Sequence, residues 1–131
     1  MACWLLKTEP STYSWEELVA EKETRWDGVT APAALQHIRA MKKGDKAVIY
    51  HSGDVRAAVG LAEVTTAPYV DPEGDSEKLA VMDVRAVKAL KRTVGLGEIK
   101  GDPLFAESPL VRISRLSVVP LTDEQFNRLT R

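Results

Sequence analysis

The sequence predicts an α+β protein, built as a small, curved β-barrel of five to six strands with short helices around it. Apolar, β-branched segments alternate along the chain with short segments that carry helix-capping residues. The central strands are long, and Gly60 interrupts one of them as a bulge or bend, which favours a strongly curved sheet. The 131 residues, 44% of them apolar, are enough for one hydrophobic core, so we expect a single domain over residues 1–131.

The elements of the first half are predicted from capping and periodicity. Residues 2–7 are a short apolar run, typical of a buried strand. Ser14 and Glu17 have the S-x-x-E spacing of a capping box, which predicts a helix that turns Trp15 and Leu18 inward. In chain order the predictions continue with a loop at 25–32, a short helix at 33–41, a polar turn at 41–46 and a strand at 47–52.

The elements of the second half are predicted from alternation and turn residues. A long strand is expected at 56–69, and alternating apolar residues predict another at 79–90. Thr122 and Gln125 have the spacing of a second capping box, which predicts a C-terminal helix. The remaining predictions are a polar loop at 71–78, a short helix within 96–105, and one or two strands within 108–121.

The composition narrows the class of protein. Cys3 is the only cysteine, so we expect no internal disulfide and a reducing compartment: the cytoplasm, or the nucleus in a eukaryote. No apolar run approaches the roughly 18–20 residues that span a bilayer, and the first residues indicate a strand rather than a signal peptide. The net charge of −1 argues against a protein that holds nucleic acid mainly by bulk electrostatics, but it allows a pocket that reads one base.

Patterns for catalysis and metal binding are weak in this sequence. Phosphate-loop and dinucleotide fingerprints are absent, and His37 and His51 lack cysteine or carboxylate neighbours at ligand spacing. Cys3 lies in an apolar strand, where we expect a buried structural thiol. We therefore expect no catalytic residue, no metal and no cofactor.

The tryptophans fall into two groups. Trp4 and Trp15 fit strand and helix periodicity and are expected in the core. Trp26 precedes Asp27 and Gly28, which are loop formers, so we expect an exposed or half-exposed ring there. A tryptophan face is a stacking platform for any base. We therefore predict that Trp26 lines the mouth of a base-sized pocket, where the glycine lets the backbone approach the ligand.

Motifs along the whole chain resemble the EVE domain family in sequence and order. They are WLLKTEPSTYSWEEL, TRWDGV, HIRAMKKGDKAVIYHSGD with AAVGLAEV, APYVDPEG, MDVRAVKALKR, EIKGDPLF and SPLVRISRLSVVPLT. The resemblance implies a PUA-like fold. It also implies a reader without enzymatic activity that holds one flipped, modified base in a small aromatic pocket. Methylated cytosine in DNA and modified RNA nucleosides are the expected ligands.

The resemblance also implies which residues bind the ligand. Trp26 would stack on the base, and Tyr50 or His51 would shape another wall. The ligand-binding positions are Lys7, Glu9, Pro10, Ser11, Trp26, Gly28, Val29, Tyr50, His51 and Ser52. Contacts to the nucleic-acid backbone are expected from Arg39, Lys42, Lys43 and Arg112.

The sequence departs from the family after W-D-G-V, where Thr30 and Ala31 stand in place of the common Arg-Asn. An asparagine offers a donor and an acceptor that alanine lacks. If that asparagine contacts the ligand, specificity differs in this chain. If it only caps the next helix, the change matters little.

Two other functions stay open on the sequence alone. The same pocket could serve a small enzyme or binding protein for a nucleoside-like metabolite, with Glu9 or His51 as a general base. A protein-interaction domain, with partners unknown, would instead use all of its aromatic residues in the core. Turnover of a nucleoside would indicate the enzyme, and a fully buried Trp26 ring would favour the interaction domain.

Overall fold

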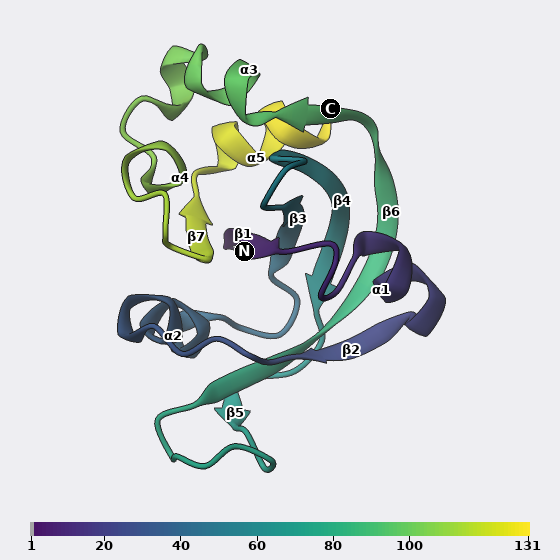
Figure 1. The fold of residues 1–131 in the computed structure, drawn as a ribbon, viewed down its shortest axis with the longest axis vertical. Coiled ribbons are helices and arrows are strands. Elements are labelled where there is room, and N and C mark those ends of the chain that lie inside the picture. The colour runs from purple at the N-terminus through teal and green to yellow at the C-terminus, as the bar shows by residue number, and fades with distance from the viewer. Residues whose placement is uncertain (1) are drawn as a thin grey trace.

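A mixed sheet of seven strands organises the fold of this computed structural model, which describes residues 2–131. The strands are β1 (Cys3–Thr8), β2 (Glu23–Trp26), β3 (Lys46–His51), β4 (Ala57–Val64), β5 (Tyr69–Val70), β6 (Ala80–Gly95) and β7 (Val118–Leu121). Their order in the sheet is β2-β6-β4-β3-β1-β7, and β5 pairs with β6 outside this path. β1 and β3 run parallel, whereas the other paired strands are antiparallel. Figure 1 shows the strong curvature, with β6 sweeping along one side of the molecule up to α3.

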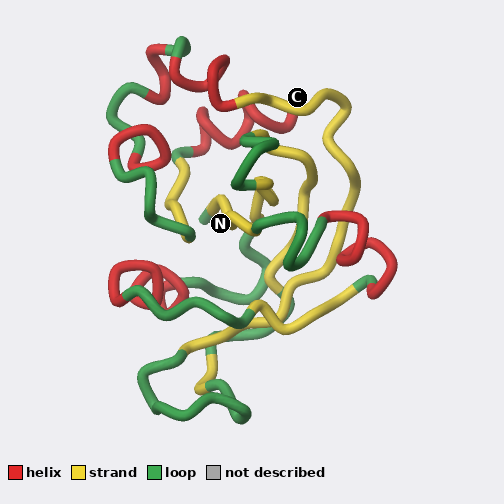
Figure 2. The backbone as a smooth tube through the Cα atoms, in the orientation of Figure 1, coloured by secondary structure: helices red, strands yellow, loops and turns green. Residues whose placement is uncertain are grey.

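Short helices surround the sheet. They are α1 (Trp15–Glu21), α2 (Pro32–Ala40), α3 (Leu96–Lys100), the 3-10 helix η1 (Pro103–Phe105), α4 (Pro109–Arg112) and α5 (Asp123–Thr130). Figures 1 and 2 show the helices of the C-terminal third grouped at one end of the molecule, with α2 on its own below β7. Within residues 2–131, no helix has the length and apolar character needed to cross a bilayer.

Both predicted capping boxes are confirmed. The Ser14 side chain accepts a hydrogen bond from the Glu17 amide, and the Glu17 side chain accepts one from the Ser14 amide. Thr122 and Gln125 make the same reciprocal pair at the start of α5. These pairs satisfy backbone donors that a helix N-terminus otherwise leaves without partners, so each helix begins where its sequence signal predicts.

The predicted irregularity at Gly60 is also confirmed. The register between β4 and β6 shifts between Ala58 and Gly60, and the register between β3 and β4 shifts between Ile49 and Tyr50. A Cβ atom at position 60 would lie 2.4 Å from Cε3 of Trp15. Glycine therefore lets the Trp15 ring pack directly on the backbone where the sheet bends.

The core is filled by side chains from the central strands and from the surrounding helices. Its fully buried members include Leu5, Leu6, Ile49, Met82, Phe105 and Leu129. Cys3 is buried as predicted, with its Sγ 3.8 Å from Oδ1 of Asp123. Burial and the neighbouring Asp123 carboxylate raise the pKa of this thiol, so it is kept protonated and has a structural role.

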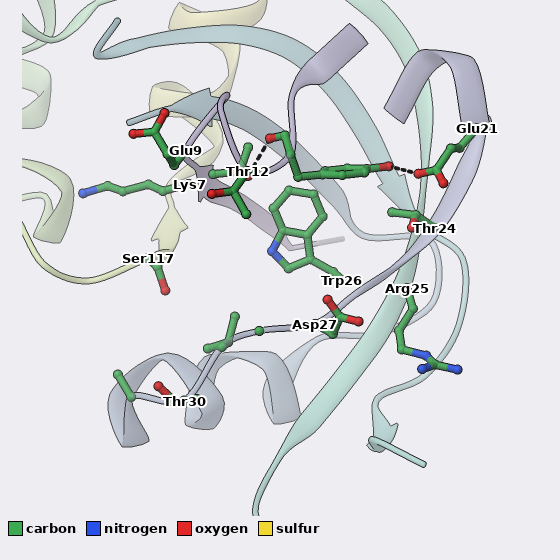
Figure 3. Close-up of a pocket in the computed structure, with 15 residues that line it drawn as sticks. Lys7, Glu9, Thr12, Glu21, Thr24, Arg25, Trp26, Asp27, Thr30 and Ser117 are labelled. Atoms are coloured by element: carbon green, nitrogen blue, oxygen red, sulfur yellow. Dashed lines mark hydrogen bonds between the residues drawn. The ribbon is translucent and has the colours of Figure 1, made fainter. Parts of the chain in front are cut away.

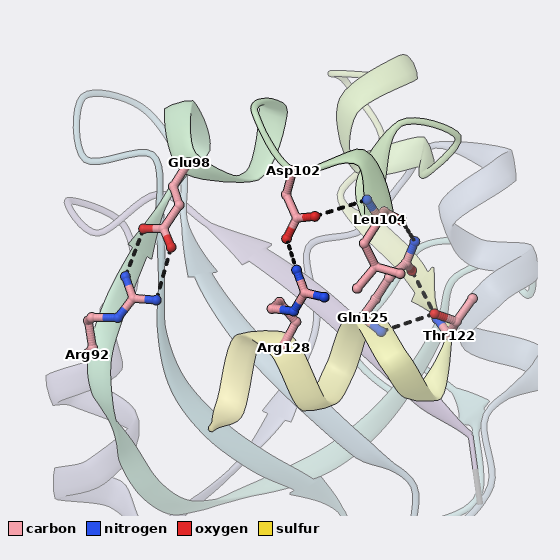
Figure 4. A network of polar contacts seen from close by, with 7 residues as sticks. All are labelled: Arg92, Glu98, Asp102, Leu104, Thr122, Gln125 and Arg128. Carbon is pink, nitrogen blue, oxygen red and sulfur yellow. Dashed lines mark hydrogen bonds and ion pairs between the residues drawn. The ribbon is translucent and has the colours of Figure 1, made fainter.

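A polar network joins the C-terminal helices to the end of β6 (Figure 4). Arg92 on β6 donates two hydrogen bonds to Glu98 on α3, of 2.8 and 2.9 Å. Asp102 caps η1 by accepting from the Leu104 amide at 3.0 Å, and it also pairs with Arg128 on α5. The hydrogen bond from the Leu104 amide, followed by the Arg128 charge, lowers the pKa of the Asp102 carboxyl. The network holds this end of the molecule in place.

Several sequence predictions about the elements are corrected. The sheet has seven strands rather than five to six, and its pairing is an open path between β2 and β7, which does not confirm a barrel. Residues 23–26 form strand β2 where the loop was expected to begin. The strand expected at 56–69 ends at Val64, and Tyr69–Val70 is a separate strand. Pro109–Arg112 is a helix, because Ser108 caps it and Pro109 starts it.

Candidate functional site

A cavity of about 570 Å³ opens between the end of β1, strand β2 and the loop that leads into α2. We call it the Trp26 cavity, and Figure 3 shows its lining. Its volume lies within the range of about 300–1,000 Å³ that is usual for small-molecule sites. The lining residues are Lys7, Thr8, Glu9, Thr12, Tyr13, Glu21, Thr24, Arg25, Trp26, Asp27, Gly28, Val29, Thr30, Ala31 and Ser117.

Trp26 contributes an aromatic wall to this cavity from the last position of β2. It pairs with Met82 of β6 and is 6% exposed, so the expectation of an exposed or half-exposed ring is wrong. The ring is buried because β2 pairs with β6. A strand of only four residues has no periodic signal from which this pairing could be predicted. The ring nevertheless has open space beside it, because Trp26 belongs to the cavity lining.

Tyr13 forms a second aromatic wall. Its ring centroid lies 6.2 Å from that of Trp26, and the two ring planes meet at 84°. The Thr8 hydroxyl donates to the Tyr13 carbonyl at 2.7 Å, and the Tyr13 hydroxyl donates to the Glu21 carboxylate. Burial and the Glu21 hydrogen bond raise the pKa of Tyr13 to about 12, so the phenol stays neutral at physiological pH. The two rings are thus held edge to face at fixed positions.

The loop from Asp27 to Ala31 forms the opposite rim. Gly28 has φ of 82°, a left-handed conformation that favours glycine, and an added Cβ would meet no atom within 4 Å. Space is therefore left beside the Gly28 backbone. Ala31 is the N-cap of α2, where no side-chain hydrogen bond closes the helix, and it also lines the cavity. Position 31, where the resemblance leads us to expect asparagine, is thus both the cap of α2 and part of the cavity wall.

The charged groups of the cavity are mostly engaged by the protein. Lys7 donates from Nζ to the Ser114 carbonyl at 3.0 Å, and burial lowers its pKa. Arg25 reaches out of the cavity to Glu73 at 2.6 Å. Glu9 accepts from the Ser11 amide at 3.1 Å. The three lining carboxylates, Glu9, Glu21 and Asp27, outnumber the two cations, so the cavity is not built for a phosphate.

The structure brings together some of the predicted ligand-binding residues and separates others. The five that line the cavity are Lys7, Glu9, Trp26, Gly28 and Val29. The lining does not include Pro10, Ser11, Tyr50, His51 or Ser52. Tyr50 is 3% exposed, and its ring centroid lies 5.7 Å from Nζ of Lys7, which does line the cavity. The ligand-binding roles of all these residues stay predictions.

His51 has a structural partner. Its Nε2 accepts a hydrogen bond of 3.0 Å from the Trp15 amide at the start of α1, and the residue is 6% exposed. The Ser52 amide donates to the Thr8 carbonyl at 2.9 Å. The first interaction joins the end of β3 to the start of α1, and the second joins it to the end of β1. Within residues 2–131 no group of three metal-ligating side chains is close enough to hold a metal ion.

The four residues expected to contact a nucleic-acid backbone lie on exposed surface outside the cavity lining. Arg39 is in the last turn of α2, and Lys42 and Lys43 follow that helix. Arg112 is in α4, where it pairs with Glu107. Their proposed role depends on a path for the nucleic acid across this surface.

Sequence reasoning missed several lining residues. Thr24 had a usable signal, because residues two apart on a strand share a face and Trp26 follows it at that spacing. Tyr13 stood out only as one more aromatic in the first 26 residues. Ser117 had no local signal: it reaches the cavity because its carbonyl accepts a 2.9 Å hydrogen bond from the Lys7 amide.

Comparison with known proteins shows likeness over nearly the whole chain. Residues 2–131 match the EVE domain. Thymocyte nuclear protein 1 of Rattus norvegicus is 33% identical over 95% of this chain and 70% of that protein. Rpa0253 from Rhodopseudomonas palustris, solved by NMR, has a TM-score of 0.92 at 39% identity, covering 99% of this chain and 91% of that one. Human THYN1, solved in complex with 5-methylcytosine-containing DNA, has a TM-score of 0.87 at 30% identity, covering 99% of this chain and 96% of that one.

Proposed function

This chain belongs to the EVE domain family, and from that premise we propose that it is a nucleic-acid reader that holds one flipped, modified base in the Trp26 cavity. The observation that carries the proposal is a cavity with room for a base, two fixed aromatic walls and a glycine-bearing rim. Human THYN1, a similar structure, was solved with DNA that contains 5-methylcytosine, which supports nucleic acid as the partner here too. The fold is PUA-like. Such a reader acts where its nucleic acid is, in the cytoplasm or in a eukaryotic nucleus.

The energetics favour a single-stranded or damaged target. Stacking one base on an aromatic ring contributes about 1–3 kcal/mol, while extruding a base from a duplex costs a few kcal/mol. A single cavity therefore gives little net affinity for intact duplex. A buried methyl group adds about 0.8 kcal/mol, a several-fold gain in affinity. Selective reading therefore also needs the cavity to leave an unmodified or wrong base with an unsatisfied group.

The charges indicate where each part of a nucleotide would lie. A neutral base suits a cavity whose carboxylates outnumber its cations, whereas a phosphate would be repelled there. The sugar-phosphate backbone would then cross the exposed surface that carries Arg39, Lys42, Lys43 and Arg112. Exposed cations of this kind give salt-dependent affinity that is the same for every sequence.

A metabolite enzyme that uses the same cavity is less well supported. Its general base would be Glu9 or His51. The Nε2 of His51 already accepts a hydrogen bond from the Trp15 amide, and His51 does not line the cavity. Glu9 accepts from the Ser11 amide with one oxygen, and the other lies 2.3 Å from where a Cβ of Gly53 would be. We therefore propose a binding protein rather than a catalyst.

The proposal is tested by titrating the protein with short single-stranded oligonucleotides that carry one central cytosine or 5-methylcytosine. Binding is followed by fluorescence anisotropy at two salt concentrations. We expect tighter binding to the modified strand, and weaker binding by Trp26→Phe because the stacking face is smaller. Trp15→Phe is the matched control, because that equally buried ring lies outside the cavity lining. Failure to bind either strand, or an equal loss in both variants, would contradict the proposal.

A further inference from the structure

We propose, resting on the function above, that Asp27 makes the Trp26 cavity selective for a base with an exocyclic amine. Cytosine and 5-methylcytosine carry this amine at position 4, where thymine carries a carbonyl oxygen. Thymine and 5-methylcytosine share the same 5-methyl group. A cavity that reads only the methyl group would therefore accept both bases.

Asp27 differs from the other carboxylates of the cavity because its acceptors are free. Glu21 accepts from the Tyr13 hydroxyl, and Glu9 accepts from the Ser11 amide. Across residues 2–131, no hydrogen bond or ion pair is formed by the Asp27 side chain. Glu9 and Glu21 each keep one oxygen in a protein hydrogen bond, whereas both oxygens of Asp27 are open to a ligand.

The position of Asp27 suits contact with the edge of a stacked base. Asp27 follows Trp26 in the chain, and both residues line the cavity (Figure 3). Strand β2 ends at Trp26, and the positive φ of Gly28 turns the chain immediately after Asp27. The alternation that would point neighbouring side chains to opposite faces therefore stops at this point. A base that stacks on Trp26 would present its edge to the carboxylate.

The chemistry of a carboxylate makes it discriminate where a hydroxyl does not. An ionised carboxylate only accepts hydrogen bonds, whereas the hydroxyls of Thr12, Thr24 and Thr30 in the same lining can donate or accept. The amine at position 4 would donate to Asp27. Asp27 is exposed in the free protein, so the bound base itself must exclude water from the carboxylate. The carbonyl of thymine would then face a negative charge and be left without a donor.

The test uses four single-stranded oligonucleotides that differ at one central base: 5-methylcytosine, cytosine, thymine or uracil. Because hydrogen bonds to charged groups are the stronger ones, we expect 5-methylcytosine to bind at least about tenfold tighter than thymine. In Asp27→Asn this ratio should fall towards one, because the amide can donate to the thymine carbonyl as well as accept from the amine. Glu16→Gln is the control. Glu16 is an exposed residue of α1 outside the cavity lining, and this variant removes the same charge.

The outcomes separate this inference from the proposed function. Equal binding of thymine and 5-methylcytosine by the wild type would overturn the role of Asp27 alone. An unchanged ratio in Asp27→Asn, with both affinities weakened by Trp26→Phe, would do the same. Absence of binding to all four oligonucleotides would overturn the proposed function, and this inference with it.

Discussion

Two tryptophans of this chain are equally buried but face different surroundings. Trp15 is 5% exposed and Trp26 is 6% exposed. Each borders a hollow of similar size, about 540 Å³ beside Trp15 and about 570 Å³ beside Trp26. We call the first the Trp15 groove; it is lined by Trp15, Glu16, Val19, Lys22, Ala86, Val87, Lys88 and Ala89.

The two surroundings differ in what they offer a ligand. The Trp15 ring packs on Gly60, and most other residues of its groove are aliphatic or long charged side chains. The Trp26 ring has Tyr13 edge-on, a glycine rim and a free carboxylate at Asp27. Burial alone therefore does not separate a structural tryptophan from one that can stack on a base. The aromatic ring held edge-on and the glycine in the rim, which the Trp15 groove lacks, do.

The largest effect is expected from the variant that tests the structural role of Trp15. Trp15→Ala removes a large buried ring and should lower the free energy of unfolding by about 3–5 kcal/mol. The base affinity of the molecules that stay folded should be unchanged, because the ring is outside the Trp26 cavity. Urea denaturation and an anisotropy titration below the unfolding transition measure the two quantities. A loss of base affinity in this variant would place the binding site elsewhere.

A smaller effect is expected from Gly60→Ala. The new Cβ would lie 2.4 Å from Cε3 of Trp15, so the ring or the strand must shift. Overpacking of this kind costs about 1–3 kcal/mol of the free energy of unfolding. In the double variant with Trp15→Ala the clash is removed. The loss of stability in the double variant should therefore be smaller than the sum of the losses in the two single variants. If urea denaturation shows that the two losses of unfolding free energy are strictly additive, the Trp15 ring is not what prevents a side chain at position 60.

Gly28→Ala tests whether the ligand of the Trp26 cavity lies close to the Gly28 backbone. The cost to stability should be about 1–2 kcal/mol, from the positive φ alone, because a Cβ there meets no atom within 4 Å. The methyl group would however enter the space at the cavity rim and weaken base binding. Gly44→Ala is the matched control, since its φ is 95° and its Cβ would also meet nothing within 4 Å. Equal base affinities in the two variants would contradict a close approach of the ligand to Gly28.

The smallest effect concerns the pH dependence of Tyr13. Its pKa is raised from 10.0 to about 12, so the neutral phenol is favoured in the folded protein. Its contribution to stability should be complete below pH 10.0 and lost as the pH rises towards about 12. The difference in stability between wild type and Tyr13→Phe should therefore shrink over that window. Ultraviolet absorbance of the phenolate follows the ionisation, and a tyrosine that titrates at its ordinary value would contradict the geometry with Glu21.

The parts of the fold that local chemistry dictates could be predicted from the sequence. The capping boxes at Ser14 and Thr122 depend on residues three apart, and both helices begin there. The bend at Gly60 follows from a single glycine in an apolar strand. The β-branched residues around Pro109–Arg112 favour a strand, but the Ser-Pro pair starts a helix there.

The candidate site was predicted only in part, because it is assembled by pairing between distant strands. Trp26 was found as a wall residue, but its burial comes from pairing β2 with β6, which no short stretch encodes. A ligand-binding role for His51 stays a prediction; its hydrogen bond from the Trp15 amide requires the end of β3 to meet the start of α1, which no local pattern encodes. The family resemblance supplied positions, and the packing decides which of them line the cavity.

The most direct test of the account is to follow the indole N–H signals of the three tryptophans by NMR during titration with a single-stranded oligonucleotide that contains 5-methylcytosine. Each signal is assigned with a Trp→Phe variant. The account predicts that the Trp26 signal shifts in step with binding while those of Trp4 and Trp15 hardly move. A Trp26 signal that stays in place at saturation, or a shift confined to Trp15, would contradict base reading in the Trp26 cavity.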